Sequence, residues 1–273
     1  MSDRPTLQRL REVPSWLDEL GLLTVSRHGG TLHGRRAASI EEGSSLQAPA
    51  DRSTHPNGAS DVTGSRSGYF ETRLAHLPQR RGVWQHICRY LRKWIAPTDD
   101  VLELGAGWCD FANTIAARNV VAMDIDSTVV KAAAPHVRAE VGDCSDLRRF
   151  ENASFDVVFA SNLLEHLDRP TATSLLEEAA RVLRPGGRLI LLQPNFRLNP
   201  GGYFDDYTHV AIYTDRSLHD YLKSLGWRDV VIQPRFLPLT MKSRASSLTF
   251  LVPWYLRSPI KPLAGQMLAV ARR

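Results

Sequence analysis

Cysteine is scarce in this sequence of 273 residues. The three thiols, Cys88, Cys109 and Cys144, form no C-x-x-C pair, which argues against a disulfide framework and indicates a reducing compartment. No apolar run approaches the roughly twenty residues that a membrane-spanning helix needs. The first residues, MSDRPTLQRLREV, also lack the apolar core of a secretory signal. We therefore expect a cytoplasmic protein, and the sequence predicts no metal site.

Strong charge of either sign is also missing. The net charge is only +5, and no aromatic-plus-basic module of the kind that binds RNA is evident. A mildly basic total can accompany an anionic partner, but local clusters of charge decide this better than the total does. We expect no nucleic-acid partner.

Large aliphatic side chains are nearly absent from residues 34–68, which contain only three of them among many Ser, Gly, Ala and Arg. Such a segment cannot bury enough apolar surface to offset its ordering entropy, so we expect a flexible linker. Before it, apolar residues recur at three- and four-residue spacings, which predicts a helical extension over 1–33. The ordered domain is then expected over 69–273.

A glycine turn interrupts a short apolar run in residues 101–111, which read VLELGAGWCDF. The run predicts a buried strand, and the residues of 111–117 suit a helix after the turn. Glycine lets a backbone approach a ligand closely, because it has no Cβ and tolerates positive φ. A dinucleotide site would have a third glycine where this chain has Asp110, an acid that would repel a pyrophosphate. Glu103, two residues before the first glycine, suits a cationic or amino-bearing ligand better.

A polar side chain follows each of the next three predicted strands. The strands and the side chains after them are 120–123 with Asp124, 137–141 with Asp143, and 155–160 with Asn162. Asp124 lies about twenty residues beyond the glycine turn, the separation at which a carboxylate reaches a ribose diol in a nucleotide-binding unit. Its competitor, Asp126, better suits the N-cap of the next helix.

The alternation of strands and helices predicts an α/β fold. We expect a Rossmann-like, doubly wound, mostly parallel seven-stranded sheet with helices on both faces. The remaining expected elements are helices over 83–95, 171–183 and 215–225 and strands over 188–193, 227–232 and 267–271. Ligands of such sheets bind at the carboxyl ends of the strands, so the polar side chains named above are expected to converge there.

The pentapeptide E-L-G-A-G at 103–107 resembles the first motif of the class I S-adenosylmethionine-dependent methyltransferases, whose acid–x–G–x–G turn holds the methionine end of the donor. The tracts N-L-L-E-H-L at 162–167 and L-R-P-G-G-R-L at 183–189 are similar to two further motifs of that family. Cys109 is a minor departure, since the family often has a third glycine there. The resemblance covers roughly 69–233 and implies S-adenosylmethionine as the cofactor.

The resemblance also implies a set of donor-binding residues. Asp143 would accept the adenine amino group and the N–H of Cys144 would meet a ring nitrogen, with a simple turn aspartate as the alternative for Asp143. Tyr69 and Arg73 lie where related enzymes often place a cap over the donor, or else they form an ordinary packing turn. The full set is Tyr69, Arg73, Glu103, Gly105, Ala106, Gly107, Asp124, Ile125, Asp143, Cys144 and Asn162.

Residues 203–209, which read YFDDYTH, form a polar and aromatic stretch that packing alone explains poorly. Transfer of a methyl group to a hydroxyl or an amine requires loss of a proton, and a neutral histidine is a suitable base. We expect His209 to be this base, oriented by Asp205 or Asp206. His166 is the second candidate, with a structural role in pinning its loop as the alternative.

The acceptor is indicated only in outline. Relatives that methylate the amino groups of nucleic-acid bases carry a D/N-P-P-Y/F tract after the fourth strand, and 160–163 reads ASNL instead. The lead-in Y-F-x-x-R-L at 69–74 and the D-D-Y-T-H loop are similar to bacterial methyltransferases of glycan or lipid-glycan biosynthesis. The sequence therefore predicts O-methylation of a sugar-like or other small hydroxylated acceptor. The alternatives are methylation of a quinone- or polyketide-type small molecule, and a catalytically silent protein that binds the donor and serves a partner.

Residues 234–265 hold five prolines and several aromatic residues between the last two predicted strands. In the resembled family those two strands form a hairpin, so we interpret the stretch as an insertion. We expect it to be either a lid over the acceptor or a patch for peripheral membrane contact. The oligomeric state stays open.

Overall fold

The computed structural model describes residues 80–238 and 250–273. The helical extension predicted over 1–33, the linker predicted over 34–68, and the proposed cap residues Tyr69 and Arg73 all lie outside the described residues. None of the helices in the described part of the chain is long and apolar enough to cross a membrane.

Seven strands form one sheet in the order β3-β2-β1-β4-β5-β7-β6. Their bounds are β1 Asp100–Leu104, β2 Asn119–Asp124, β3 Val137–Val141, β4 Phe155–Ser161, β5 Leu183–Pro194, β6 Arg228–Gln233 and β7 Gln266–Arg272. The first five pair in parallel, and β7 runs antiparallel between β5 and β6. The seven-stranded, mostly parallel sheet predicted from the sequence is confirmed.

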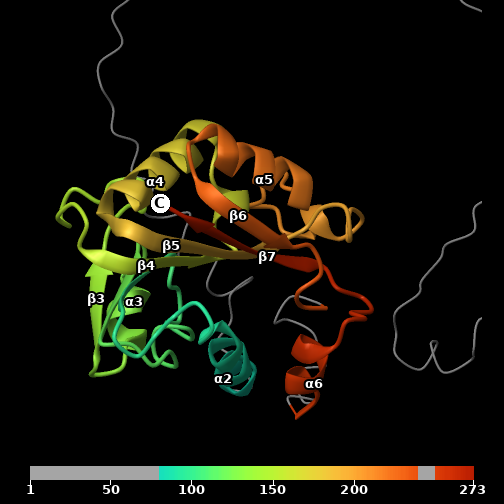
Figure 1. Ribbon diagram of the computed structural model, residues 1–273, viewed down its shortest axis with the longest axis horizontal. Coiled ribbons are helices and arrows are strands. Elements are labelled where there is room, and N and C mark those ends of the chain that lie inside the picture. The colour runs from blue at the N-terminus through green and yellow to red at the C-terminus, as the bar shows by residue number, and fades with distance from the viewer. Residues whose placement is uncertain (1–79, 239–249) are drawn as a thin grey trace, which may run out of the picture. The chain divides into compact units, whose positions relative to one another are not determined.

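Helices cover both faces of the sheet (Figure 1). Those of the described residues are α2 Arg80–Leu91, α3 Thr128–Ala132, α4 Arg169–Val182, α5 Asp215–Ser224 and α6 Val252–Arg257, with short 3₁₀ turns at Leu164–His166 and Tyr203–Asp205. Figure 1 places α4 and α5 on one face and α2 and α3 on the other, with α6 beside α2. This is the doubly wound arrangement.

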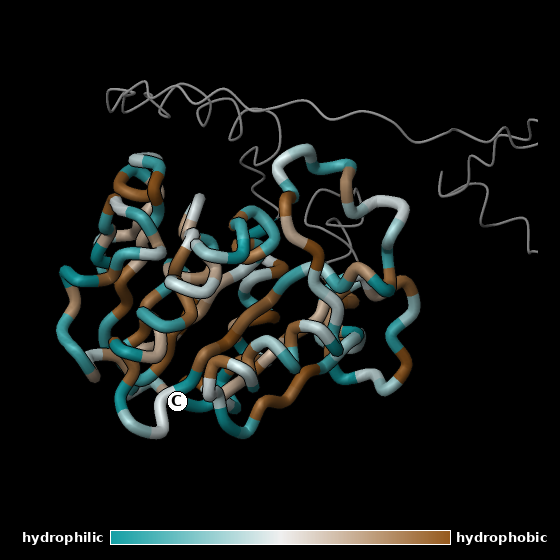
Figure 2. Tube along the Cα trace, turned by 90° about the horizontal axis from the view of Figure 1, so that it is seen from above, coloured by the Kyte–Doolittle hydropathy of each residue, from teal (hydrophilic) through white to brown (hydrophobic). Residues whose placement is uncertain are grey.

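Two buried apolar clusters hold the layers together, one on each face of the sheet. In α2, Ile87 and Leu91 recur four residues apart, so they lie on one side of the helix and are fully buried against the sheet. On the other face, Leu175 of α4 and Leu218 of α5 are equally buried. Figure 2 shows the hydrophobic residues concentrated along the strands, as expected of parallel strands covered on both sides.

The helix predicted over 111–117 is absent, and residues 107–114 form a run of successive turns instead. Cys109 has a φ of +54°, which interrupts the right-handed helical path directly after the glycine turn. The amide nitrogen of Ala112 donates to Oε2 of Glu103 at 3.0 Å. Asn113 donates from its side chain to the carbonyl of Ala132 and accepts from the N–H of Ala134, at 2.9 and 2.7 Å. These contacts tie the segment to Glu103 of β1 and to the end of the α3 segment.

Two smaller differences concern element ends. Helix α2 ends at Leu91, earlier than the prediction, and 92–95 continue as a turn closed by bonds to the carbonyl of Leu91. Strand β5 begins at Leu183, earlier than the predicted strand over 188–193, and contains a bulge around Gly186, where Phe155 pairs with Leu183 but Val157 pairs with Arg188. Gly186 has a φ of +78°, which explains why the extra residues of the bulge include glycine.

Candidate active site

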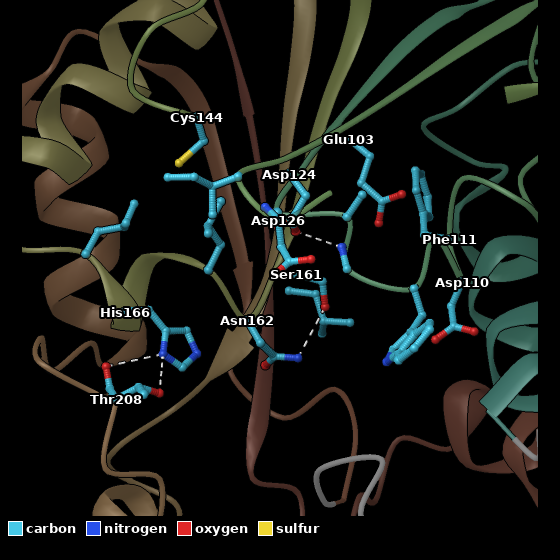
Figure 3. Close-up of a pocket in the computed structure, with 18 of the residues that line it drawn as sticks. Glu103, Asp110, Phe111, Asp124, Asp126, Cys144, Ser161, Asn162, His166 and Thr208 are labelled. Atoms are coloured by element: carbon cyan, nitrogen blue, oxygen red, sulfur yellow. Dashed lines mark hydrogen bonds between the residues drawn. The ribbon is translucent and has the colours of Figure 1, made fainter. Parts of the chain in front are cut away.

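A cavity of about 730 Å³ opens at the carboxyl ends of the parallel strands. All the donor-binding residues predicted within the described part of the chain line it, namely Glu103, Gly105, Ala106, Gly107, Asp124, Ile125, Asp143, Cys144 and Asn162. Figure 3 shows several of these side chains facing a common space, together with His166 and Thr208. Residues that lie up to 59 positions apart in the sequence (103 to 162) thus meet at one edge of the sheet.

The glycine turn forms one wall of this cavity. Gly105 and Gly107 have φ values of +68° and +53°, a region that other residues rarely adopt. A Cβ on Gly105 would lie 2.9 Å from Cδ1 of Leu163, so a larger residue at this position would push the Leu163 side chain away. The N–H of Gly107 donates to Oδ2 of Asp124 at 2.8 Å, which fixes the turn against the end of β2.

Asp124 therefore has a structural contact as well as a place in the cavity. Its other oxygen, Oδ1, accepts from the N–H of Asp126 at 2.9 Å, and burial raises the pKa of its carboxyl. Asp126 in turn accepts from the N–H of Thr128 at 2.8 Å at the start of α3, close to the capping role predicted for it. Each Asp124 oxygen keeps a second lone pair with which to accept from a ligand hydroxyl.

Glu103 is 4% exposed and sits below the glycine turn. Burial raises the pKa of its carboxyl well above the usual range, and the negative charges of Asp110 and Asp124 raise it further. The N–H of Ala112 opposes this shift in part by donating to Oε2. An acid so placed gains most from a positively charged neighbour, because the neighbour replaces the hydration that burial removed.

Several residues of the cavity were missed by the sequence predictions. Arg80 and Asp110 form an ion pair at 2.7 Å, and both line the cavity. The aromatic side chains of Trp84 and Phe111 line it too, and Phe111 stacks on Phe159 with ring centroids 3.8 Å apart. The only sequence signal for Trp84 was its position on the apolar stripe of α2, which also suits a core residue.

Asp143, Cys144 and Asn162 complete the donor side of the cavity. Oδ1 of Asp143 accepts from both the N–H and the hydroxyl of Ser145 at 2.8 Å, which is the turn geometry that the sequence left as an alternative. Asn162 has a φ of +50°, and its Oδ1 accepts from Nε2 of Gln266 at 2.9 Å. Gln266 begins β7 and is 4% exposed, so a strand far along the chain orients this asparagine.

His166 also faces the cavity, and its ring orientation is set by the loop at 203–209. Its Nδ1 lies 2.9 Å from Oγ1 of Thr208 and 3.3 Å from the Thr208 carbonyl oxygen. The Thr208 hydroxyl donates to Oδ1 of Asp206 at 2.6 Å, so it can only accept from His166. Nδ1 of His166 therefore carries the ring proton, and Nε2 keeps its lone pair. Figure 3 shows this second nitrogen pointing away from Thr208 into the open space.

His209 lies behind His166 and is not among the residues that line the cavity. Its Nδ1 lies 2.5 Å from the carbonyl oxygen of Tyr203, and its ring packs edge-on against His166 with centroids 4.8 Å apart. Of the two candidate histidines, His166, the second candidate from the sequence, is the one that lines the cavity. Of the two acids expected to orient the base, Asp206 is linked to His166 through the Thr208 hydroxyl, and its backbone carbonyl accepts from the N–H of His209 at 3.2 Å.

Glu165 lies next to this pair and is 1% exposed. Within the part of the chain that the structure describes, neither oxygen of its carboxyl has a hydrogen-bond partner in another residue, and one of them lies within 4.8 Å of a ring nitrogen of His166 and of His209. Burial, with a smaller contribution from the charge of Asp206, raises the pKa of Glu165 to about 8. The spacing of these three groups would allow a metal ion, but a carboxyl that keeps its proton is a poor ligand.

Comparison with known proteins agrees with this geometry. Residues 102–191 match the family model described as "Methyltransferase domain". The chain is 34% identical over 100 residues to a ubiquinone biosynthesis O-methyltransferase of Xanthomonas oryzae, which covers 33% of this chain and 41% of that protein. It is 38% identical over 109 residues to a probable S-adenosylmethionine-dependent methyltransferase of Mycolicibacterium smegmatis, covering 37% of this chain and 41% of that protein.

These alignments span less than half the length of either relative. Among solved structures, the fold is similar to that of an S-adenosylmethionine-dependent methyltransferase from Archaeoglobus fulgidus, with a TM-score of 0.55 and 18% sequence identity. That match covers 76% of this chain and 99% of the other. Residues 102–191 thus match a methyltransferase domain, and the fold of the chain is similar to that of S-adenosylmethionine-dependent methyltransferases.

Proposed function

We propose that this chain transfers a methyl group from S-adenosylmethionine to a hydroxyl oxygen of a small acceptor, with His166 as the general base. The observation that carries the proposal is the orientation of His166. Its Nδ1 is held by Thr208 while Nε2 points into the same cavity that the predicted donor-binding residues line. A base needs its accepting atom within reach of the reacting hydroxyl, and Nε2 is directed to that space.

The residues at the glycine turn fit the donor. Glu103 is a buried acid in need of a cation, which the ammonium of the methionine end would supply. The backbone of 105–107 is open enough for close approach, because a Cβ at Gly105 would fill that space. Asp124 stands at the end of β2, where its remaining lone pairs suit a ribose diol. Asp143 and Cys144, after β3, would meet the adenine.

The donor, when bound, supplies an electrophilic methyl group to the acceptor oxygen. The residues of this chain hold the reactants in place and take up the proton. Nε2 of His166 accepts the hydroxyl proton. Nδ1 keeps its own proton and donates it in a hydrogen bond to the Thr208 hydroxyl, and Asp206 stabilises that arrangement by accepting from the same hydroxyl. Positioning of the two reactants accounts for much of the rate in such displacements, so the base adds to an alignment already made by the cavity.

The acceptor would enter on the side of Tyr207, Thr208 and Val210, which line the cavity beside His166. Tyr207 and Val210 are exposed, so this entrance offers apolar surface next to the base. A small hydroxylated molecule with an apolar part fits such an entrance. The name of the Xanthomonas relative supports a quinone-type phenol, whereas the loop at 203–209 supports the sugar-like acceptor predicted from the sequence.

The test is transfer of a labelled methyl group. The full chain is incubated with methyl-labelled S-adenosylmethionine and cell extract separated into small-molecule, lipid and glycan fractions. Label bound as an O-methyl group in a small hydroxylated product, lost in His166→Gln, supports the proposal. Donor binding in calorimetry without label in any fraction would make the chain a silent donor-binding protein and overturn it.

A further inference from the structure

Acidic residues are absent from two segments that lie together in the fold. From Val230 to Arg273 the chain has seven Lys and Arg and neither Asp nor Glu, and residues 80–98, which include α2, contain no acid either. Helix α6 packs beside α2 (Figure 1). Where α6 meets α2, the described residues of these two segments therefore offer basic side chains and no acidic ones.

Large apolar side chains project from the α6 segment. Five of them, Phe250, Leu251, Trp254, Ile260 and Leu263, fall within fourteen residues and are exposed, with Trp254 at 78% and Ile260 at 76%. We refer to these five residues as the α6 apolar surface. Exposed apolar residues are ordinary when scattered singly, but a group of this kind on a short segment marks an interaction site.

The segment that presents this surface is itself well anchored. Leu256, on the inner side of α6, is 4% exposed and belongs to the core cluster shared with α2. The Tyr255 hydroxyl donates to the carbonyl of Pro262 at 2.9 Å, and Nζ of Lys261 donates to the carbonyl of Leu256 at 3.0 Å. Helix α6 and the turn after it, residues 250–263, therefore form a fixed helical hairpin that turns Trp254 and Ile260 outward.

Positive charge gathers where α2 meets this hairpin. Nζ of Lys93 lies 3.5 Å from the ring centroid of Tyr90, and Nζ of Lys261 lies 6.0 Å from the same centroid. Arg89, Arg92 and Arg257 are exposed nearby in sequence. Within the described part of the chain, none of these five basic residues forms an ion pair with a carboxylate. This part of the surface therefore carries positive charge, which attracts an anionic partner.

We propose that the α6 apolar surface docks this protein on an anionic lipid bilayer. A tryptophan with neighbouring aliphatic residues suits the boundary between headgroups and acyl chains, and the surrounding Lys and Arg suit anionic headgroups. Apolar burial and electrostatic attraction to anionic lipids add to one another in peripheral binding, and this hairpin offers both. A second copy of the chain would place one basic region against another, which charge repulsion disfavours. The inference concerns a surface outside the cavity and does not depend on the proposed methyl transfer.

The test is co-sedimentation of the full chain with vesicles of phosphatidylcholine alone and of phosphatidylcholine with phosphatidylglycerol. We expect binding to the anionic vesicles that weakens at high salt, and little binding to the neutral ones. The double variant Trp254→Ala/Ile260→Ala should weaken binding at least tenfold, and Arg257→Glu should weaken it mainly at low salt. Val130→Ala, which removes an exposed apolar side chain from α3, is the matched control and should bind as the wild type does.

Two outcomes would overturn the proposal. One is absence of wild-type binding to anionic vesicles, or equal binding by the double variant. The other is concentration-dependent dimerisation that the double variant abolishes, which would assign the surface to a second copy of the chain. Donor affinity and melting temperature are measured for every variant, and both should match the wild type because the mutated side chains lie outside the cavity and the core.

Discussion

The Thr208 hydroxyl lies 2.9 Å from Nδ1 of His166, and this contact decides which ring nitrogen carries the proton. Because the same hydroxyl donates to Asp206, it must accept from the imidazole. The loop that carries Thr208 is separated from His166 by some forty residues, so the tautomer of a residue after β4 is set by a segment after β5.

Replacing His166 by Gln should reduce turnover by roughly 10²- to 10⁴-fold, the usual contribution of a general base, with little effect on donor affinity. His209→Gln is the matched control: its ring contacts His166 but does not line the cavity, so a smaller loss is expected. Wild-type turnover should rise with pH through the range in which histidines titrate, since only a neutral imidazole accepts a proton. Similar losses in the two variants would contradict the assignment of His166.

Thr208→Val keeps the shape of the side chain but removes the hydroxyl that links His166 to Asp206. We expect kcat to fall by about tenfold or more while KM for the donor stays close to the wild-type value, because the ring loses its orientation but the donor side is intact. Thr208→Ser restores a hydroxyl and should rescue most of the rate. If Thr208→Ser is as impaired as Thr208→Val, the threonine acts through packing and the positioning role is wrong.

Much of the site could be predicted because its residues follow local rules. The glycines need positive φ, Asp124 follows an apolar strand, and the carboxyl ends of parallel strands share one edge of the sheet. Long-range partners could not be predicted in this way. Gln266 orients Asn162 across 104 positions, and only the antiparallel pairing of β7 with β5 brings it there. Which of His166 and His209 faces the cavity depends on how the side chains of the 203–209 loop pack, and the sequence shows no pattern for that packing.

The missing helix after the glycine turn has a similar explanation. Residues 111–117 have the apolar spacing of a helix, but Cys109 just before them has a φ of +54°, which is outside the helical range. A periodic pattern records which side chains are buried and does not record the backbone dihedrals of the turn that precedes them. The prediction failed there for that reason.

Donor binding should release protons, because Glu103 has a raised pKa in the free protein. A bound ammonium would favour the ionised carboxylate and lower that pKa. Binding therefore releases a fraction of a proton per molecule at any pH between the pKa of Glu103 in the free protein and its pKa in the complex. Calorimetry of S-adenosylmethionine binding in two buffers of different ionisation enthalpy measures the release. Glu103→Gln should abolish it and weaken binding by about tenfold or more, as expected when a hydrogen bond to a charged group is lost. Proton release that persists in Glu103→Gln would place the titrating group elsewhere.

Glu165 should make the stability of the fold depend on pH. Burial raises its pKa to about 8, so the folded state holds this proton more tightly than the unfolded chain, whose glutamates titrate near 4.3. The stabilisation that this proton gives the folded state is fully present at pH values below the pKa of Glu165 in the unfolded chain. It is lost as pH rises to about 8, at roughly 1.4 kcal/mol per pH unit. Glu165→Gln mimics the protonated form. Its free energy of unfolding should match the wild type near pH 4 and exceed it increasingly up to about pH 8.

Urea unfolding at several pH values measures this difference, with Glu177→Gln, which alters an exposed carboxyl of α4, as the control that should show no such trend. Parallel curves for Glu165→Gln and the wild type would mean that the carboxylate is ionised and compensated in the folded protein. A metal ion shared with His166 and His209 is the compensation that the spacing allows. In that case a chelator would lower both the stability and the methyl-transfer rate of the wild type, whereas a protonated Glu165 predicts that a chelator changes neither.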